Sequence, residues 1–142
     1  MKKGFTLVEL LGVIVILAVL LAISVPNILN IINSSKMSAF ENDIKTLSEN
    51  LILQYETKSS QQQLSDFKYT FPMTDTVKEV ANIKGDSPLS GEMYLEYKTE
   101  DGVKYVDVII NKVVSSDGKW CAVKKSNQKN AMIYESSDVN CQ

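Results

Sequence analysis

The chain has 142 residues, enough for one domain of ordinary size, with 44% hydrophobic residues and a formal net charge of −2. A nucleic-acid-binding protein that relies on electrostatics needs a basic surface, so this balance argues against nucleic acid as a partner. The chain has no histidine, which removes the commonest metal ligand and the usual general base at neutral pH. We therefore expect neither a metal site nor a cofactor.

The N-terminus combines a short basic leader, residues 1–4, with a long apolar segment, residues 5–25. About 21 helical residues at 1.5 Å each span about 30 Å, which is the thickness of a bilayer core. The segment therefore predicts a single transmembrane helix. Lys2 and Lys3 favour a cytoplasmic N-terminus, which places the rest of the chain outside the cytoplasm.

The order of these two elements differs from that of a secretory signal, in which a small residue follows the apolar run. Here the small residue, Gly4, comes before the run. A cut after Gly4 would leave the hydrophobic helix on the mature protein. The alternative is that residues 1–4 are only the cytoplasmic tip of an uncleaved signal anchor.

Glu9 is the one carboxylate of the apolar segment. An unpaired carboxylate at membrane depth costs on the order of 2 to 4 kcal/mol, so it normally has a partner or a role. Cleavage after Gly4 would create a matching positive charge at the amine of Phe5. The alternative is that Glu9 lies near the membrane edge and reaches headgroups or bonds its own N-terminal turn.

Pro26 removes one helical hydrogen bond and is expected to kink the helix where it leaves the lipid. Beyond it, residues 26–58 predict an amphipathic helix, because apolar side chains recur at spacings of three and four. The residues of this apolar stripe are Met37, Phe40, Ile44, Leu47, Leu51 and Tyr55.

Residues 59–142 read as a soluble head in which strand patterns dominate after a polar loop at 59–65 and a short helix at 74–84, capped by Thr74 or Asp75. The turn sequence Glu100-Asp101-Gly102 joins the first two strands into a hairpin. The expected strands are 92–99, 103–112, 119–125 and 131–136. The fold class is therefore α+β: a long N-terminal helix, hydrophobic and then amphipathic, packed on an antiparallel sheet of three to four strands.

The segment KGFTLVELL, residues 3–11, with the apolar run and Pro26, resembles the processing and assembly signature of type IV pilins and type II secretion pseudopilins. The resemblance implies a pilin fold. It also implies that a prepilin peptidase cuts between Gly4 and Phe5 and methylates the amine of Phe5. In this family Glu9 would meet the amine of a neighbouring subunit during assembly, which would fix the register of the fibre.

Cys121 and Cys141 lie on the part of the chain placed outside the cytoplasm, where disulfides persist. A bond between them would contribute about 3 kcal/mol in the chain-entropy model. It would resemble the disulfide-bounded loop of many pilins. Two free buried thiols are the alternative.

Two further sequence patterns are weak indications of a functional site. Ser116 and Lys119 have the S-x-x-K spacing of some serine acyl enzymes, but the residues between them are typical of a turn and the companion motifs are missing. A small basic cluster consists of Lys124, Lys125 and Lys129. It is either a solvated surface or a contact for DNA or another anion. We expect no enzyme, because no nucleophile, base and orienting group occur together.

The leading hypothesis is a structural subunit of a type IV pilus, a fimbrium for motility, adhesion or surface colonisation. Its partners would be other copies of itself, minor pilins, the prepilin peptidase, and an inner-membrane assembly platform with its ATPases. It would begin as a single-pass protein of the cytoplasmic membrane and end in an extracellular fibre. The alternatives are a minor pilin or pseudopilin of a secretion or DNA-uptake apparatus, an adhesive or DNA-binding tip subunit, and an uncleaved single-pass receptor.

Overall fold

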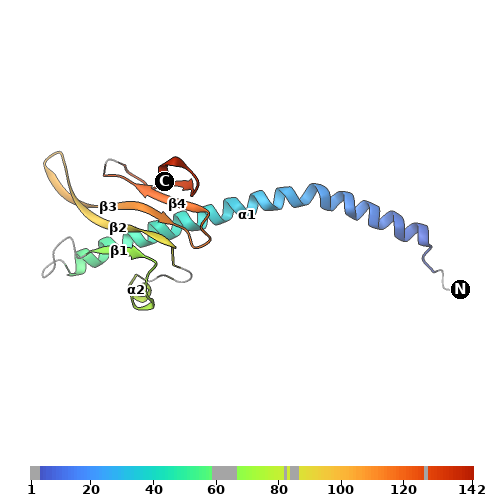
Figure 1. The fold of residues 1–142 in the computed structure, drawn as a ribbon, viewed down its shortest axis with the longest axis horizontal. Coiled ribbons are helices and arrows are strands. Elements are labelled where there is room, and N and C mark those ends of the chain that lie inside the picture. The colour runs from blue at the N-terminus through green and yellow to red at the C-terminus, as the bar shows by residue number, and fades with distance from the viewer. Residues whose placement is uncertain (1–3, 59–66, 82, 84–86, 127) are drawn as a thin grey trace. The chain divides into compact units, whose positions relative to one another are not determined.

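The structure, a computed structural model, describes residues 4–58, 67–81, 83, 87–126 and 128–142. The chain divides into two compact units, Met1–Lys36 and Met37–Gln142. One helix, α1 (Leu7–Lys58), contributes residues to both units, and all the strands belong to the second (Figure 1). The predicted α+β class, a long N-terminal helix followed by an antiparallel sheet, is confirmed.

The first unit contains the apolar part of α1. Its most apolar 18-residue window has a mean hydropathy of 2.9 and no buried residue, so by length and composition α1 can cross a membrane. Pro26 lies inside α1, which continues past it without interruption. Nearby, the Ser24 hydroxyl donates to the Leu20 carbonyl at 2.8 Å, so this polar side chain finds its partner on its own helix. A kink at Pro26 stays a prediction.

The second half of α1 packs on the sheet through the predicted apolar stripe. Phe40, Ile44, Leu47 and Leu51 are exposed by 6% or less, and Met37 and Tyr55 are partly buried against the same core. Their spacing of three and four residues places them on one helix face. The facing core residues include Met93, Leu95, Val108, Ile110, Val113 and Ala122.

The sheet is an antiparallel meander with the strand order β1-β2-β3-β4-β5, one strand more than the three to four that the sequence predicted. Its strands are β1 (Lys68–Phe71), β2 (Ser90–Glu100), β3 (Val103–Val114), β4 (Trp120–Lys124) and β5 (Met132–Glu135). The additional strand is β1. It has only four residues, and it pairs with the beginning of β2, from Lys68 opposite Tyr94 to Phe71 opposite Gly91.

Gly91 marks an irregularity in the pairing of β2 with β3, where the register shifts between Ser90 and Glu92. Its φ is +108°, and a Cβ there would lie 2.3 Å from the carbonyl oxygen of Lys112. Only glycine tolerates both the left-handed backbone and the close approach. Lys112 itself has a φ of +50°. A β-bulge therefore fixes the register at this end of the sheet.

Helix α2 (Asp75–Val80) lies within the predicted 74–84 helix but ends earlier. Thr74 is the residue before its first turn, and its side chain makes no capping hydrogen bond. The predicted loop at 59–65 lies outside the described residues.

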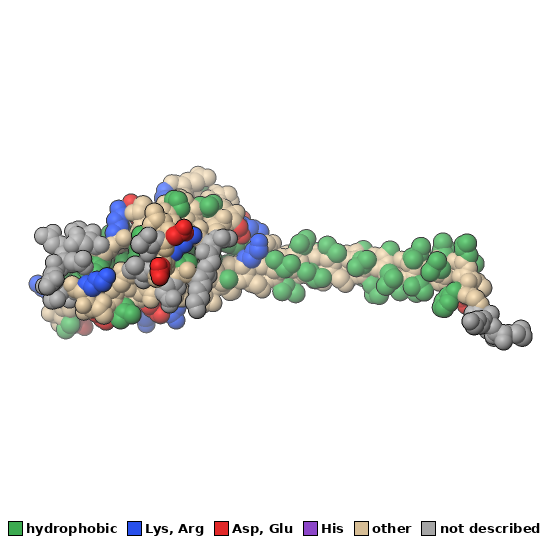
Figure 2. Space-filling view, turned by 90° about the horizontal axis from the view of Figure 1, so that it is seen from below, with side chains coloured by type: hydrophobic (Ala, Val, Ile, Leu, Met, Phe, Trp, Pro, Cys, Tyr) green, Lys and Arg blue, Asp and Glu red, His purple; other side chains and the backbone are tan. Residues whose placement is uncertain are grey.

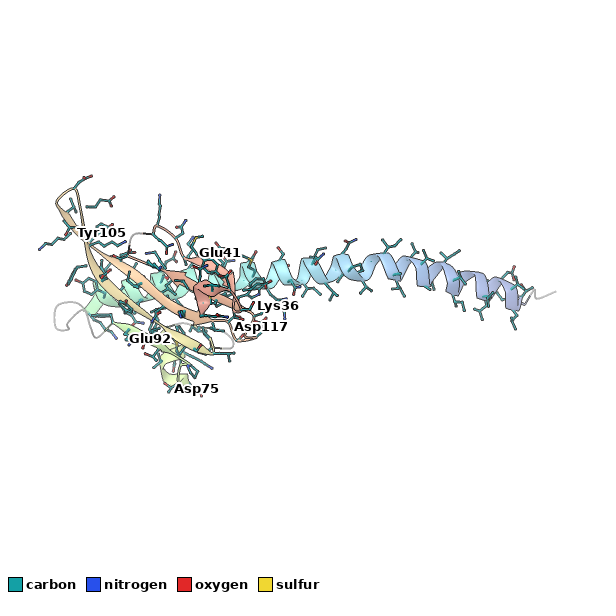
Figure 3. The ribbon with its side chains drawn as sticks, turned by 45° about the horizontal axis from the view of Figure 1, so that its top comes forward. Lys36, Glu41, Asp75, Glu92, Tyr105 and Asp117 are labelled. Carbon is teal, nitrogen blue, oxygen red and sulfur yellow. A yellow bond between two sulfur atoms is a disulfide. The ribbon has the colours of Figure 1, made fainter. Side chains whose placement is uncertain are left out.

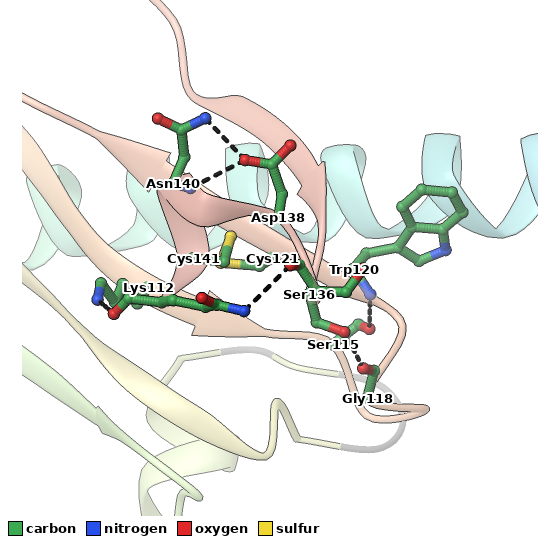
Figure 4. Close-up of a disulfide and its surroundings, with 11 residues drawn as sticks. Lys112, Ser115, Gly118, Trp120, Cys121, Ser136, Asp138, Asn140 and Cys141 are labelled. Atoms are coloured by element: carbon green, nitrogen blue, oxygen red, sulfur yellow. Dashed lines mark hydrogen bonds between the residues drawn. A yellow bond between two sulfur atoms is a disulfide. The ribbon is translucent and has the colours of Figure 1, made fainter.

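The C-terminal segment ends in a short 3₁₀ helix, η2 (Val139–Cys141), and a disulfide joins Cys141 to Cys121 of β4 (Figure 4). The bond resolves the choice between a disulfide and two free thiols. Hydrogen bonds also hold this segment: the Ser136 hydroxyl donates to the Gly118 carbonyl, and the Lys112 ammonium donates to the Gln142 carbonyl. The C-terminal segment is thereby fixed to β3, to β4 and to the turn between them.

Candidate assembly site at the start of the helix

The first turn of α1 is closed by a capping box formed by Thr6 and Glu9. Thr6 is the N-cap residue, since α1 begins at Leu7 and the Leu10 amide donates to the Thr6 carbonyl at 3.2 Å. The Glu9 amide donates to the Thr6 hydroxyl at 3.3 Å, and the Thr6 amide donates to the Glu9 carboxylate at 2.8 Å. Two amides that a helix N-terminus leaves without partners are thus satisfied reciprocally.

The carboxylate of Glu9 is held through one of its two oxygens. Both the amide and the hydroxyl of Thr6 donate to Oε2, each at 2.8 Å. Within the described part of the chain, no hydrogen bond or ion pair involves Oε1. A carboxylate accepts several hydrogen bonds at once, so Oε1 can accept another donor while the capping box stays intact.

Thr6 is a site residue that the sequence analysis did not single out. The signal was present, because the residues from Thr6 to Glu9 read Thr-Leu-Val-Glu, the S/T-x-x-E pattern of a capping box. The alternative role for Glu9, a bond to its own N-terminal turn, therefore describes a contact that the structure contains. That contact still leaves Oε1 for a second role.

Gly4 and Phe5 lie outside α1, in non-helical chain just before the cap. A Cβ added to Gly4 would meet no atom within 4 Å, and Phe5 is 84% exposed. The peptide bond between them is therefore not covered by other described residues. Pro26 lies far along the same helix and takes no part in this arrangement.

The apolar side chains that follow the cap are exposed on all sides of the helix. The large hydrophobic residues from Leu7 to Ile32 range in exposure from 81% at Leu7 to 44% at Ile32. Figure 2 shows green side chains in repeated clusters along the helix, with tan atoms between them. Apolar surface of this extent needs a covering, either hydrocarbon or other protein.

A comparison with known families identifies this same segment. The family model of the prokaryotic N-terminal methylation motif matches residues 1–25. The chain carries the prepilin-like signal of type IV pilins and pseudopilins. The motif implies processing by a prepilin peptidase and assembly into a pilus or pseudopilus. No curated protein and no solved structure matches the chain.

The pilin-like signal covers only residues 1–25. Pro26 follows it in the first unit, and the predicted cysteines and lysine cluster lie in the second unit. The three lysines of the predicted basic cluster lie in two different environments. The Lys124 ammonium is buried and lies 2.6 Å from Asp107 Oδ1, whereas Lys125 and Lys129 are exposed. Burial alone would raise the pKa of Asp107, but hydrogen bonds from Lys124 and Lys98 lower it below its usual value. Lys124 is therefore part of an internal ion pair.

Proposed function

We propose that this chain is the structural subunit of a type IV pilus, which polymerises through its N-terminal helix into an extracellular fibre for motility, adhesion or surface colonisation. A prepilin peptidase would cut between Gly4 and Phe5 and methylate the amine of Phe5. The observation that carries the proposal is the methylation motif at residues 1–25 on a helix with no buried residue in its apolar window.

The exposed helix suits both proposed states of the chain, the membrane-bound precursor and the subunit of an assembled fibre. The span from Leu7 to Val25 has a length of about 28 Å at 1.5 Å per residue, which suits the hydrocarbon core of a bilayer. Lipid would cover its apolar side chains in the precursor. In the fibre the same side chains would be covered by other copies, in a heterologous contact that repeats without closing.

Glu9 supplies the specificity of that contact. Its Oε1 has no partner in the described residues, while Oε2 is bound by Thr6. The methylated amine of a neighbouring subunit would donate to Oε1 and remove two unpaired charges from an apolar environment. A subunit placed one residue out of register would leave both charges without a partner, so this pair selects one register.

Small residues on the helix support close packing between copies. Gly12 would meet no atom within 4 Å even with a Cβ added, and Ala18 and Ala22 are exposed. Small side chains let helix backbones approach closely in apolar surroundings.

Replacement of Glu9 tests the proposal. The wild type, Glu9→Gln and the control Glu41→Gln would be compared in the membrane fraction and in the fraction sheared from the cell surface. Glu41 is an exposed carboxylate of the same helix outside the apolar segment. We expect only Glu9→Gln to disappear from the sheared fraction while it stays abundant in membranes. A wild-type chain that is processed but never sheared from the surface would contradict a surface pilus and favour a pseudopilin.

A further inference from the structure

The outer face of the sheet, opposite α1, carries a groove of about 500 Å³. Strand alternation places Tyr94, Ile109, Val123 and Tyr134 on this face, and all four line the groove together with Val139 of η2. Ile109 is 8% exposed whereas Val139 is 84% exposed, so the lining combines a buried apolar part with an apolar rim that faces solvent.

The charged residues that line the groove are all cationic. Lys112, Lys124 and Lys125 take part in the lining, and no carboxylate side chain does. Lys112 donates to the Gln142 carbonyl, and Lys124 is paired with Asp107. Within the described residues, no hydrogen bond or ion pair involves the ammonium of Lys125. The groove is therefore suited to a segment that brings a carboxylate beside an apolar side chain.

The tip of the β2–β3 hairpin has this chemistry. Glu100 and Asp101 precede Gly102, and Val103 follows with 66% of its surface exposed. Positive φ values at Asp101 and Gly102, +51° and +80°, give the two-residue turn of a tight hairpin. Lys104 belongs to the opposite face of the ribbon from Val103, because successive side chains of a strand alternate.

The hairpin also projects beyond its neighbouring strands (Figure 1). In the described residues, β1 pairs with β2 only as far as Tyr94, and β4 pairs with β3 only from Ile110 onward. The remainder of β2 and β3 forms a two-stranded ribbon. Tyr105, which lies on this ribbon in Figure 3, donates its hydroxyl hydrogen to Glu100 Oε2 at 3.2 Å and so anchors the tip.

An ion-pair network holds the base of the ribbon. The Lys98 ammonium lies 2.5 Å from Asp107 Oδ2, and the Lys124 ammonium lies 2.6 Å from Oδ1 of the same carboxylate. All three side chains are less than one fifth exposed, so solvent screens this network less than it screens a surface pair. The ribbon is thereby fixed to the strand that also carries the groove.

Val103 of the tip cannot reach the apolar lining of the groove in its own subunit. Val103 and Ile109 lie on the same strand, and six residues at about 3.3 Å each separate them by about 20 Å. The tip is convex and the groove is concave, and one strand holds the two apart. Val103 can therefore contact this apolar lining only in a second copy, as a heterologous contact that continues into an open assembly.

We propose that the β2–β3 hairpin tip of one subunit binds in the outer-sheet groove of the next, with Asp101 beside Lys125 and Val103 against the apolar lining of Ile109 and Val123. The inference rests on the proposed fibre and names a second contact within it. The N-terminal helices would polymerise the subunits, and this contact would link the second units of neighbouring copies.

Charge reversal on full-length protein in assembling cells tests the contact. Asp101→Lys and Lys125→Glu each replace an attraction by a repulsion, and we expect each to lower the amount of sheared fibre about tenfold. The double variant restores the pair with its charges exchanged and should recover most of the fibre. Asp75→Lys is the control: it reverses a fully exposed carboxylate of α2 whose ion pair with Lys78, at 3.6 Å, lies at the surface, and it should leave the fibre unchanged.

A non-reducing gel of the membrane fraction verifies that each variant forms its disulfide. Wild-type fibres provide a test that needs no variant: a zero-length carbodiimide crosslinker should join Asp101 to Lys125. A crosslink between two copies also joins them into a covalent dimer on a denaturing gel, whereas a crosslink within one subunit leaves the mass of a single chain.

Four results would overturn the contact and leave the proposed pilus standing. The first is a wild-type fibre yield in both single variants, and the second is a double variant whose fibre yield does not recover. The third is a crosslinked fibre that lacks the Asp101–Lys125 peptide. The fourth is a fibre yield that falls for Lys125→Glu but not for Asp101→Lys. In the last case the groove binds a different anion. Absence of the wild-type chain from the sheared fraction would overturn the proposed pilus together with this contact, whereas a wild-type fibre indifferent to both reversals would overturn the contact alone.

Discussion

Replacing Thr6 by valine removes the hydroxyl of the capping box and keeps the shape of the side chain. Two hydrogen bonds are lost: the one that the Thr6 hydroxyl donates to Glu9 Oε2 at 2.8 Å and the one that it accepts from the Glu9 amide at 3.3 Å. The bond from the Thr6 amide to the carboxylate remains possible. Loss of an N-cap side chain destabilises a helix end by about 1 kcal/mol.

The assay is amide hydrogen exchange of the full-length chain in detergent micelles. We expect the protection of the Glu9 amide to fall about fivefold in Thr6→Val, since about 1 kcal/mol changes an opening equilibrium by that factor. Thr6→Ser keeps the hydroxyl and should retain most of the protection. Amides in the second half of α1 should be unaffected and serve as an internal reference. Equal protection of the Glu9 amide in the wild type and Thr6→Val would refute the capping box.

Three predictions concern the second unit. Gly91→Ala should lower the free energy of unfolding by about 3 kcal/mol in urea titrations, because a Cβ would meet the Lys112 carbonyl at 2.3 Å in a left-handed backbone. A loss below about 1 kcal/mol would show that the bulge relaxes around the added methyl group. Asp107 has a lowered pKa when folded, so its contribution to stability is present above its ordinary value of about 4 and is lost as pH falls through the lowered value. Unfolding curves between about pH 5 and pH 2 should therefore show a weaker pH dependence in Asp107→Asn than in the wild type, and equal slopes would argue against the ion pair. Reduction of the Cys121–Cys141 disulfide, or Cys141→Ser, should lower stability by about 3 kcal/mol, whereas an unchanged urea midpoint would mean that the bond does not constrain the unfolded chain.

Patterns that depend on near neighbours in the sequence predicted most of the fold. The apolar stripe of α1 follows from the helical period alone, and it is the stripe that the core buries. The long hairpin follows from Asp101-Gly102 between two strand-like segments, because that pair favours the required turn. Both signals lie within a few residues of the elements that they predict.

Features that depend on distant pairing were not predictable in the same way. Strand β1 has four residues, and its assignment depends on its pairing with Gly91 to Tyr94, some twenty residues later in the chain. The Cys121–Cys141 disulfide was predicted from the two cysteines and their placement outside the cytoplasm, but the packing of η2 beside β4 was not, because no periodicity encodes it. The groove is assembled from four strands, β2 to β5, and the C-terminal segment, so it exists only after folding.

The candidate assembly site was predictable in part. Gly4, Phe5 and Glu9 are marked by their order relative to the apolar run. The capping role of Thr6 was available from the Thr-x-x-Glu spacing. Only the structure shows that Thr6 binds Oε2 of Glu9 and leaves Oε1 for another donor, because no sequence pattern distinguishes the two oxygens.

The most direct test of the account is the mass of the N-terminal peptide of the chain in sheared surface fibres. We expect a mature chain that begins at a methylated Phe5, with residues 1–4 removed. A chain that retains Met1 and is confined to the membrane fraction would contradict it, because an uncleaved anchor has no free amine at Phe5 for Glu9 of a neighbouring subunit to bind.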